Sequence, residues 1–317
     1  AYGLGSMLVS LMAGREPVMV IRFFVITIGT LLAFHIRPMR ISVPWALLPV
    51  TLQAVLIFCI SVALGVLQDP GLALGVRDFA LDANWGDIYS FDGVYYRVQL
   101  IGNALLPLLF MIAVWRWQNS WIYRGLALIS LLGLLAAGNL TYFVVAVIAV
   151  ITAQGKRLMQ SVIARMVLAV MVTLFLVAAW GSLNETVSDK FEGSDSSMGV
   201  RFDQLAVAHR EMGASTVKLV LGAGLGASFP DGKQRNYSQD LYIEMQWLYL
   251  LLQLGLLGML IYVATLWLSV RQRLDQGGRR IFWLYMLSGL TNPYILDTNQ
   301  IVATVILVCV FPRRPAL

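Results

Sequence analysis

Long apolar runs separated by short polar segments make up most of this chain. A helix crosses the hydrocarbon core of a bilayer with about 20 apolar residues. The runs that we assign as spans lie at residues 1–13, 17–35, 43–67, 99–115, 122–137, 139–153, 162–181, 243–270, 281–291 and 299–312. The pattern predicts an all-α polytopic integral membrane protein, with about ten transmembrane helices in a single membrane domain over residues 1–317.

The basic residues orient these spans, because cytoplasmic loops carry an excess of Lys and Arg. Basic residues flank the stretch 122–153 on both sides, so this stretch must turn back on itself, and we predict the turn at Gly138-Asn139. Both termini are then cytoplasmic. The cytoplasmic loops hold a single acid, Asp275, beside the following basic residues: Arg37, Arg40, Arg116, Arg124, Lys156, Arg157, Arg165, Arg271, Arg273, Arg279, Arg280, Arg313 and Arg314.

Composition agrees with a membrane protein. The 317 residues are 59% hydrophobic and 13% charged, whereas about 25% of the residues in a soluble domain are charged. The net charge of +6 lies mostly in short loops, so it indicates membrane orientation and no nucleic-acid partner. Cys59 and Cys309 lie within apolar runs and lack metal-ligand spacing, so we interpret them as packing residues.

Two longer polar segments lie on the face opposite the cytoplasm, at residues 68–98 and 181–242. Loops of this length are often functional. Within the second, residues 200–212 place Phe202, Leu205, Ala206 and His209 on one helical face. This spacing predicts an amphipathic helix near the membrane surface.

Several basic residues on this face could bind an anion. Arginine suits phosphate because its planar fork donates two parallel hydrogen bonds. Arg97 follows Tyr96 and directly precedes a predicted membrane helix, and Arg201 opens the amphipathic helix. The alternative interpretation is that these residues are solvated or interfacial charges. The full set is Arg97, Arg201, Arg210, Lys218, Lys233 and Arg235.

Glu244 lies in the first turn of the predicted span 243–270. A carboxylate there is stabilised by the helix N-terminus, which is a sufficient structural reason for its presence. The functional alternative is a general base at the boundary between water and membrane. The glycines at 222–226 fall short of a nucleotide-binding fingerprint, since Ala227 occupies the last position, and we interpret them as a turn.

Three segments, in order, resemble the bacterial O-antigen polymerase and ligase superfamily. The first is Arg97-Val-Gln-Leu-Ile-Gly-Asn103, similar to an outer-face arginine followed by a Gly and Asn pair. The second runs from Gly199-Val-Arg-Phe-Asp203 to Leu219-Val-Leu-Gly-Ala-Gly-Leu-Gly226, similar to an arginine, an amphipathic helix and a glycine turn. The third begins at Glu244 and is similar to a helix ending in Gly-Leu-Leu-Gly258.

Two departures refine this resemblance. Ligases of the superfamily carry a histidine where this chain has Glu244, whereas polymerases often carry a glutamate there. The hairpin at Gly138-Asn139 lacks the Ser-Arg pair that is frequent in the family. The first departure favours a polymerase, and the second removes one usual phosphate contact.

The resemblance implies a fold like the GT-C glycosyltransferases, in the bacterial inner membrane, with a large periplasmic loop and an active site that faces the periplasm. The implied activity is polymerisation of an O-antigen or related surface glycan, as in lipopolysaccharide biosynthesis. The growing chain would pass from undecaprenyl pyrophosphate onto a lipid-linked repeat unit. Glu244 would be the catalytic base, and Arg97 and Arg201 would hold the pyrophosphate. Tyr96, Arg210, Lys233 and Arg235 would be further substrate contacts.

The same resemblance implies no metal and no cofactor, because the leaving group is already activated. Its implied partners are undecaprenyl-pyrophosphate-linked oligosaccharide, membrane lipids, a chain-length regulator and a flippase. Three alternatives stay open: a ligase that moves finished glycan to a lipid-A core or protein, a transporter of lipid-linked oligosaccharide, and a non-catalytic partner in an export complex. A transporter would place charges inside its spans, whereas here they lie near the ends.

Overall fold

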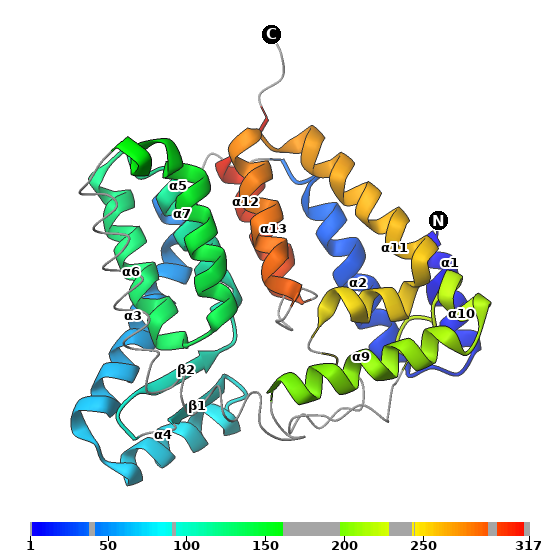
Figure 1. Ribbon diagram of the computed structural model, residues 1–317, viewed down its shortest axis with the longest axis horizontal. Helices are drawn as coiled ribbons and strands as arrows, with labels where there is room; N and C mark the ends of the chain where they lie inside the picture. Colours follow the sequence, from blue (N-terminus) through cyan, green and yellow to red (C-terminus); the bar gives the residue numbers. More distant parts are fainter. Residues whose placement is uncertain are drawn as a thin grey trace. The chain divides into compact units, whose positions relative to one another are not determined.

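The computed structural model describes residues 2–37, 42–90, 93–160, 197–227, 243, 245–290 and 297–313. This part of the chain is mostly helical, which confirms the coarser part of the predicted fold class. The chain divides into two compact units (Figure 1). One comprises Ala1–Arg40 with Asp189–Leu317, and the other comprises Ile41–Ser188. We call them the terminal unit and the central unit and describe each by itself.

The terminal unit is a helical bundle. The helix α2 packs against α1, α11 and α13, and α12 packs against α11 and α13. The helix α9 runs crosswise to α2 in the view of Figure 1 and contacts α10 and α11. The elements are α1 (Tyr2–Met12), α2 (Pro17–Ala33), α9 (Ser197–Gly213), α10 (Thr216–Leu221), α11 (Gln246–Arg273), α12 (Gln276–Leu287), η2 (Ser288–Leu290) and α13 (Thr298–Val310).

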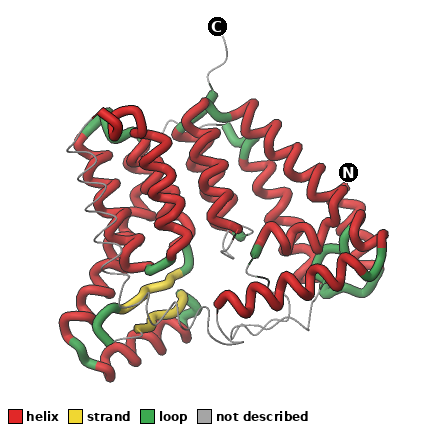
Figure 2. The backbone as a smooth tube through the Cα atoms, viewed as in Figure 1, coloured by secondary structure: helices red, strands yellow, loops and turns green. Residues whose placement is uncertain are grey.

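The central unit combines a helical core with one small sheet (Figure 2). The helix α5 lies at its centre, with nine of its residues buried, and contacts α3, α6 and α7. Strands β1 and β2 form an antiparallel hairpin, the only sheet within the described ranges. The elements are α3 (Val43–Leu67), α4 (Pro70–Asp82), β1 (Gly86–Ser90), β2 (Tyr96–Leu100), η1 (Asn103–Leu105), α5 (Leu106–Trp115), α6 (Trp121–Ala137) and α7 (Leu140–Gln160).

Local sequence explains where these helices begin and end. Asp69 caps α4, because its carboxylate accepts hydrogen bonds from the backbone N–H groups of Gly71 and Leu72. The helix α6 ends at Gly138, whose left-handed backbone, with φ of +60°, favours glycine. The helix α7 begins two residues later, so the hairpin predicted at Gly138-Asn139 is confirmed.

Two helices, Val43–Leu67 and Gln246–Arg273, are long and apolar enough to cross a membrane. The first coincides with the predicted span 43–67. Six shorter apolar helices lie within other predicted spans or within a few residues of them, and the predicted span 162–181 lies outside the described residues. A bundle of about ten transmembrane helices therefore stays a prediction.

The sequence analysis assigned no element within the segment 68–98, which contains α4 and most of the β1–β2 hairpin. The helix α11 was predicted as one span, but it is interrupted at Gly255, where φ is +66° and ψ is 179°. The first helical part of α11 therefore ends at Gly255, the first glycine of the motif Gly255-Leu-Leu-Gly258, and a second helical part continues to Arg273.

Candidate functional site

Arg97 lies in a strand. It pairs with Tyr89 across the hairpin, and η1 begins six residues later, so the expectation that Arg97 directly precedes a membrane helix is wrong. The residue is only 8% exposed, as is its neighbour Tyr96. An arginine is rarely buried to this extent unless it is paired or used, because its charge must leave water.

The side chain of Arg97 lies against the turn between α6 and α7. A Cβ atom added to Gly138 would lie 2.9 Å from both Cγ and Cδ of Arg97 and 3.1 Å from Nε. Glycine at this position is therefore required twice, once by its left-handed backbone and once by the arginine. The family that the sequence resembles often has an arginine in this hairpin. Here the hairpin contacts Arg97, which belongs to β2.

Hydrogen bonds fix the backbone on both sides of Arg97. The hydroxyl of Ser61 donates to the carbonyl of Tyr96 at 2.6 Å, and the side-chain amide of Asn103 donates to the carbonyl of Val98 at 2.8 Å. Gln53 in turn donates to Oδ1 of Asn103 at 2.8 Å. Groups held in this way keep one geometry, which is what a binding residue requires.

The strand and the short helices after it form one discontinuous segment. The ten residues of α5 extend about 15 Å, which is half of a hydrocarbon core of about 30 Å. Non-helical backbone at membrane depth is tolerated where it is buried in protein or lines a polar cavity. In a membrane, strand β2 would meet this condition, because it contacts α3 and α6 and its first three residues are buried.

Arg201 and Arg210 lie on α9, in the terminal unit. Arg201 is partly exposed in the first turns, and Arg210 is exposed in the last turn. The helix predicted over 200–212 is therefore confirmed. Its predicted apolar face points away from its packing neighbours: Phe202 is 61% exposed, whereas Val207 and Ala208 are buried.

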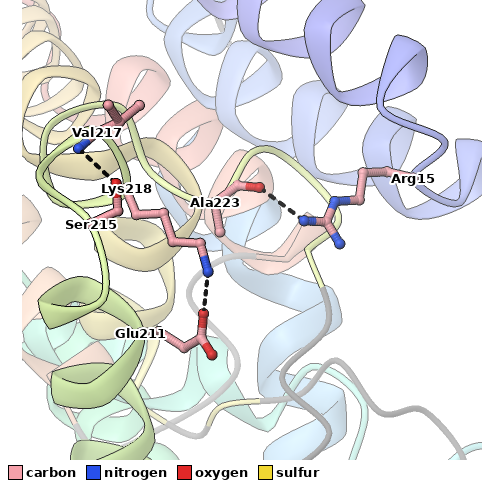
Figure 3. A network of polar contacts seen from close by, with 6 residues as sticks. All are labelled: Arg15, Glu211, Ser215, Val217, Lys218 and Ala223. Carbon is pink, nitrogen blue, oxygen red and sulfur yellow. Dashed lines mark hydrogen bonds and ion pairs between the residues drawn. The ribbon is translucent and has the colours of Figure 1, made fainter.

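Figure 3 shows how the end of α9 is joined to α10. Nζ of Lys218 lies 2.9 Å from Oε2 of Glu211, and Ser215 caps α10 by accepting from the N–H of Val217. Both charged groups are partly exposed, so we expect this ion pair to contribute less than about 1 kcal/mol. Lys218 is thus engaged by a carboxylate, which weakens it as an anion ligand.

The glycine turn after α10 docks into the interruption of α11. The backbone N–H groups of Ala223 and Gly224 donate to the carbonyls of Leu252 and Gln253 at 2.8 and 3.2 Å. These carbonyls precede Gly255, where the helix is interrupted. The turn therefore occupies the break, so the break itself is not an open binding site.

Side chains missed by the sequence analysis hold this turn in place. Gln253 is fully buried and donates to the carbonyl of Ala227 at 3.0 Å, while its own oxygen accepts from the Ala227 N–H at 3.4 Å. Ser10 accepts from the N–H of Leu225 at 2.8 Å, and Arg15 donates to the carbonyl of Ala223 at 3.3 Å (Figure 3). The only sequence signal for these contacts was Gln253 itself, a polar residue inside an apolar run.

Three predicted site residues, Glu244, Lys233 and Arg235, lie outside the described residues. The chain is described again at Ile243, which is buried, and at Met245, which precedes α11. The other predicted residues fall into two groups, Tyr96 with Arg97 on β2 and Arg201 with Arg210 on α9. The first group belongs to the central unit and the second to the terminal unit.

Comparisons with protein-family models, curated proteins and solved structures gave no significant match. Among the residues described, no group of three or more His, Cys, Asp or Glu side chains is placed to hold a metal ion.

Proposed function

We propose that the protein is a GT-C-like glycosyltransferase of the bacterial inner membrane, which polymerises an O-antigen or related surface glycan at the periplasmic face. The donor is the growing glycan on undecaprenyl pyrophosphate, and the acceptor is a lipid-linked repeat unit. The observation that carries the proposal is Arg97, a buried arginine held on a fixed strand against the α6–α7 turn.

A buried, fixed guanidinium suits a pyrophosphate leaving group. In surroundings from which water is excluded, an arginine fork stabilises phosphate charge more strongly than it does in water. Preorganised donors of this kind also stabilise charge that develops in a transition state without having to reorient. Arg97 would therefore bind the pyrophosphate and stabilise it as it departs, with Tyr96 beside it.

The reaction needs one bond exchange. A hydroxyl of the acceptor sugar attacks the anomeric carbon of the donor glycan, and the bond from that carbon to the pyrophosphate oxygen breaks. The acceptor proton passes to the carboxylate of Glu244, the proposed general base. Undecaprenyl pyrophosphate leaves with the bonding electrons, and Arg97 and Arg201 compensate its charge. Arg210, Lys233 and Arg235 are proposed as further contacts to phosphate or sugar.

The test is the glycan of cells that lack the gene and carry variants of Arg97. The Arg97→Lys variant keeps the charge but loses the planar fork, and Arg97→Ala loses both. We expect each to reduce polymer formation by at least about 100-fold, as does removal of one preorganised donor from an active site. Arg77→Lys is the matched control, because Arg77 forms a partly exposed ion pair with Asp87 in the same unit and should leave the polymer unchanged.

The products separate the alternatives. A polymerase defect leaves single repeats on the final acceptor, whereas a ligase defect leaves long polymer on the lipid carrier. A transporter defect leaves lipid-linked repeats on the cytoplasmic side, with nothing on the acceptor. Normal chain lengths with Arg97→Ala, at normal protein level, would contradict the proposal.

A further inference from the structure

The helix α4 and the β1–β2 hairpin form a layered insert beside α3. Strand β2 packs on α3, β1 pairs with β2, and α4 packs on β1. The insert contacts α3 from Gln53 to Gly65. Gln53 donates to the carbonyl of Ile101, and a Cβ added to Gly65 would lie 2.5 Å from the carbonyl oxygen of Val94. At a rise of 1.5 Å per residue, these contacts cover about 18 Å of a helix that is apolar enough to cross a membrane.

The helix α4 has a buried side, a charged side opposite it and exposed apolar side chains on both flanks, with Leu74 and Leu81 on the flank away from Phe79. Ala80 is buried where the helix packs on β1. Asp78 is exposed and lies about 200° from Ala80 around the helix, on the side away from β1. Between these sides, Leu72 and Phe79 are exposed, and the ring of Phe79 meets that of Trp85 edge to face, with 5.4 Å between centroids.

A partly exposed ion pair links α4 to the hairpin. Nε of Arg77 lies 2.8 Å from Oδ1 of Asp87 on β1. The hydrogen bond to Asp87, and then its charge, raise the pKa of Arg77 above its ordinary value. The exposed aromatic rings are therefore carried on an element held to β1 by both packing and charge.

We propose that this insert lies in the outer interfacial layer of the bilayer, with lipid covering the apolar side formed by Leu72, Phe79 and Trp85 while Asp78 faces water. This inference rests on the proposed membrane location. Phe79 and Trp85 are 60% and 53% exposed, and large apolar side chains gathered on one surface require a cover. Two observations indicate lipid as that cover.

The first observation is continuity with α3. Val66, near the end of α3, is 76% exposed, so the exposed apolar surface of the candidate span continues along the chain into α4. The second is the chemistry of the insert: tryptophan is enriched at membrane interfaces, and an amphipathic helix there keeps its charged side in water. Arg97, on the strand between α3 and β1, would then lie at the depth of lipid headgroups.

Spin labels in proteoliposomes test this placement. The chain has two cysteines, so Cys59→Ser with Cys309→Ser gives a background in which single cysteines can be labelled. We would label Phe79→Cys on the apolar side and Asp78→Cys on the charged side. Collision rates with oxygen, which partitions into lipid, and with a water-soluble nickel chelate report the depth of each label.

We expect the label at residue 79 to collide several times more often with oxygen, relative to the nickel chelate, than the label at residue 78. A third label, at Leu52→Cys on the exposed side of α3, tests the membrane location itself. If residue 52 is in lipid but residues 78 and 79 are equally open to nickel, the insert is in water and the inference is wrong. If residue 52 is also open to nickel, the membrane location fails, and this inference fails with it.

Discussion

The contact between Gly138 and Arg97 gives the sharpest prediction, which is the effect of Gly138→Ala. The added methyl group would lie 2.9 Å from Cγ and Cδ of Arg97. These atoms are in the middle of the side chain, so the guanidinium must move with them. The backbone at residue 138 has φ of +60°, which costs a residue other than glycine about 1–2 kcal/mol.

Two effects are therefore expected together. Stability should fall by about 1–2 kcal/mol, which for a unit of roughly 150 residues lowers Tm by a few degrees. Polymer formation should fall much further than this loss explains, because the proposed anion-binding group has moved. The assay compares thermal unfolding of the purified protein with the glycan chain length in complemented cells.

Gly93→Ala is the matched control. Gly93 lies between the strands of the hairpin, with φ of +71°, and an added Cβ would meet nothing within 4 Å. This variant should show a similar backbone cost with normal polymer. Gly138→Asn separates the effects further, because asparagine tolerates the left-handed conformation but still crowds Arg97. If Gly138→Ala and Gly93→Ala give the same polymer length, the reasoning about Arg97 is refuted.

Two further variants test how the glycine turn is held on α11. Gly222→Ala should leave little folded protein, because φ at residue 222 is +82° and the added Cβ would lie 2.4 Å from the carbonyl oxygen of Gln253. The control is Gly213→Ala, where an added Cβ meets nothing within 4 Å and the yield should be normal. Gln253→Leu should lower the free energy of unfolding by about 1–3 kcal/mol, since it removes the side-chain donor to the buried carbonyl of Ala227, whose N–H keeps a bond to the carbonyl of Gly224. An unchanged Tm would contradict this.

Hydropathy predicted the helices where the signal is simple. The span 43–67 coincides with α3, and the turn at Gly138-Asn139 followed from basic residues on both sides of one apolar stretch. In these cases one local property, either apolar length or charge, decides the structure. The orientation of the chain in a membrane stays a prediction.

The sequence did not reveal features that depend on tertiary contacts. The strands β1 and β2 have five residues each and depend on packing against α3 and α4, which no local pattern encodes. The interruption at Gly255 lies inside a long and mostly apolar run, so hydropathy cannot detect it. The periodicity of α9 identified an apolar face. It did not show that another side, with Gln204 and Val207, would be the buried one.

The candidate site was predicted by residue type and motif order more than by geometry. Arg97 was predicted to be an anion ligand, which stays a prediction, and its strand and its contact with Gly138 were not foreseen. An exposed arginine and a buried one have the same sequence signal, since burial depends on residues distant in the chain. Gln253 was missed because a single polar residue in a span has several equally common roles.

The most direct test of the central claim is the glycan profile, resolved by size, of cells lacking this gene and complemented with wild type or Glu244→Gln. The substitution keeps the shape of the side chain and removes its ability to accept a proton at neutral pH. The proposed polymerase predicts that wild type restores long chains, whereas Glu244→Gln leaves single repeats on the acceptor at normal protein level. Long chains made by Glu244→Gln would contradict the assignment of the base, and long polymer retained on the lipid carrier in the deletion strain would contradict the polymerase itself.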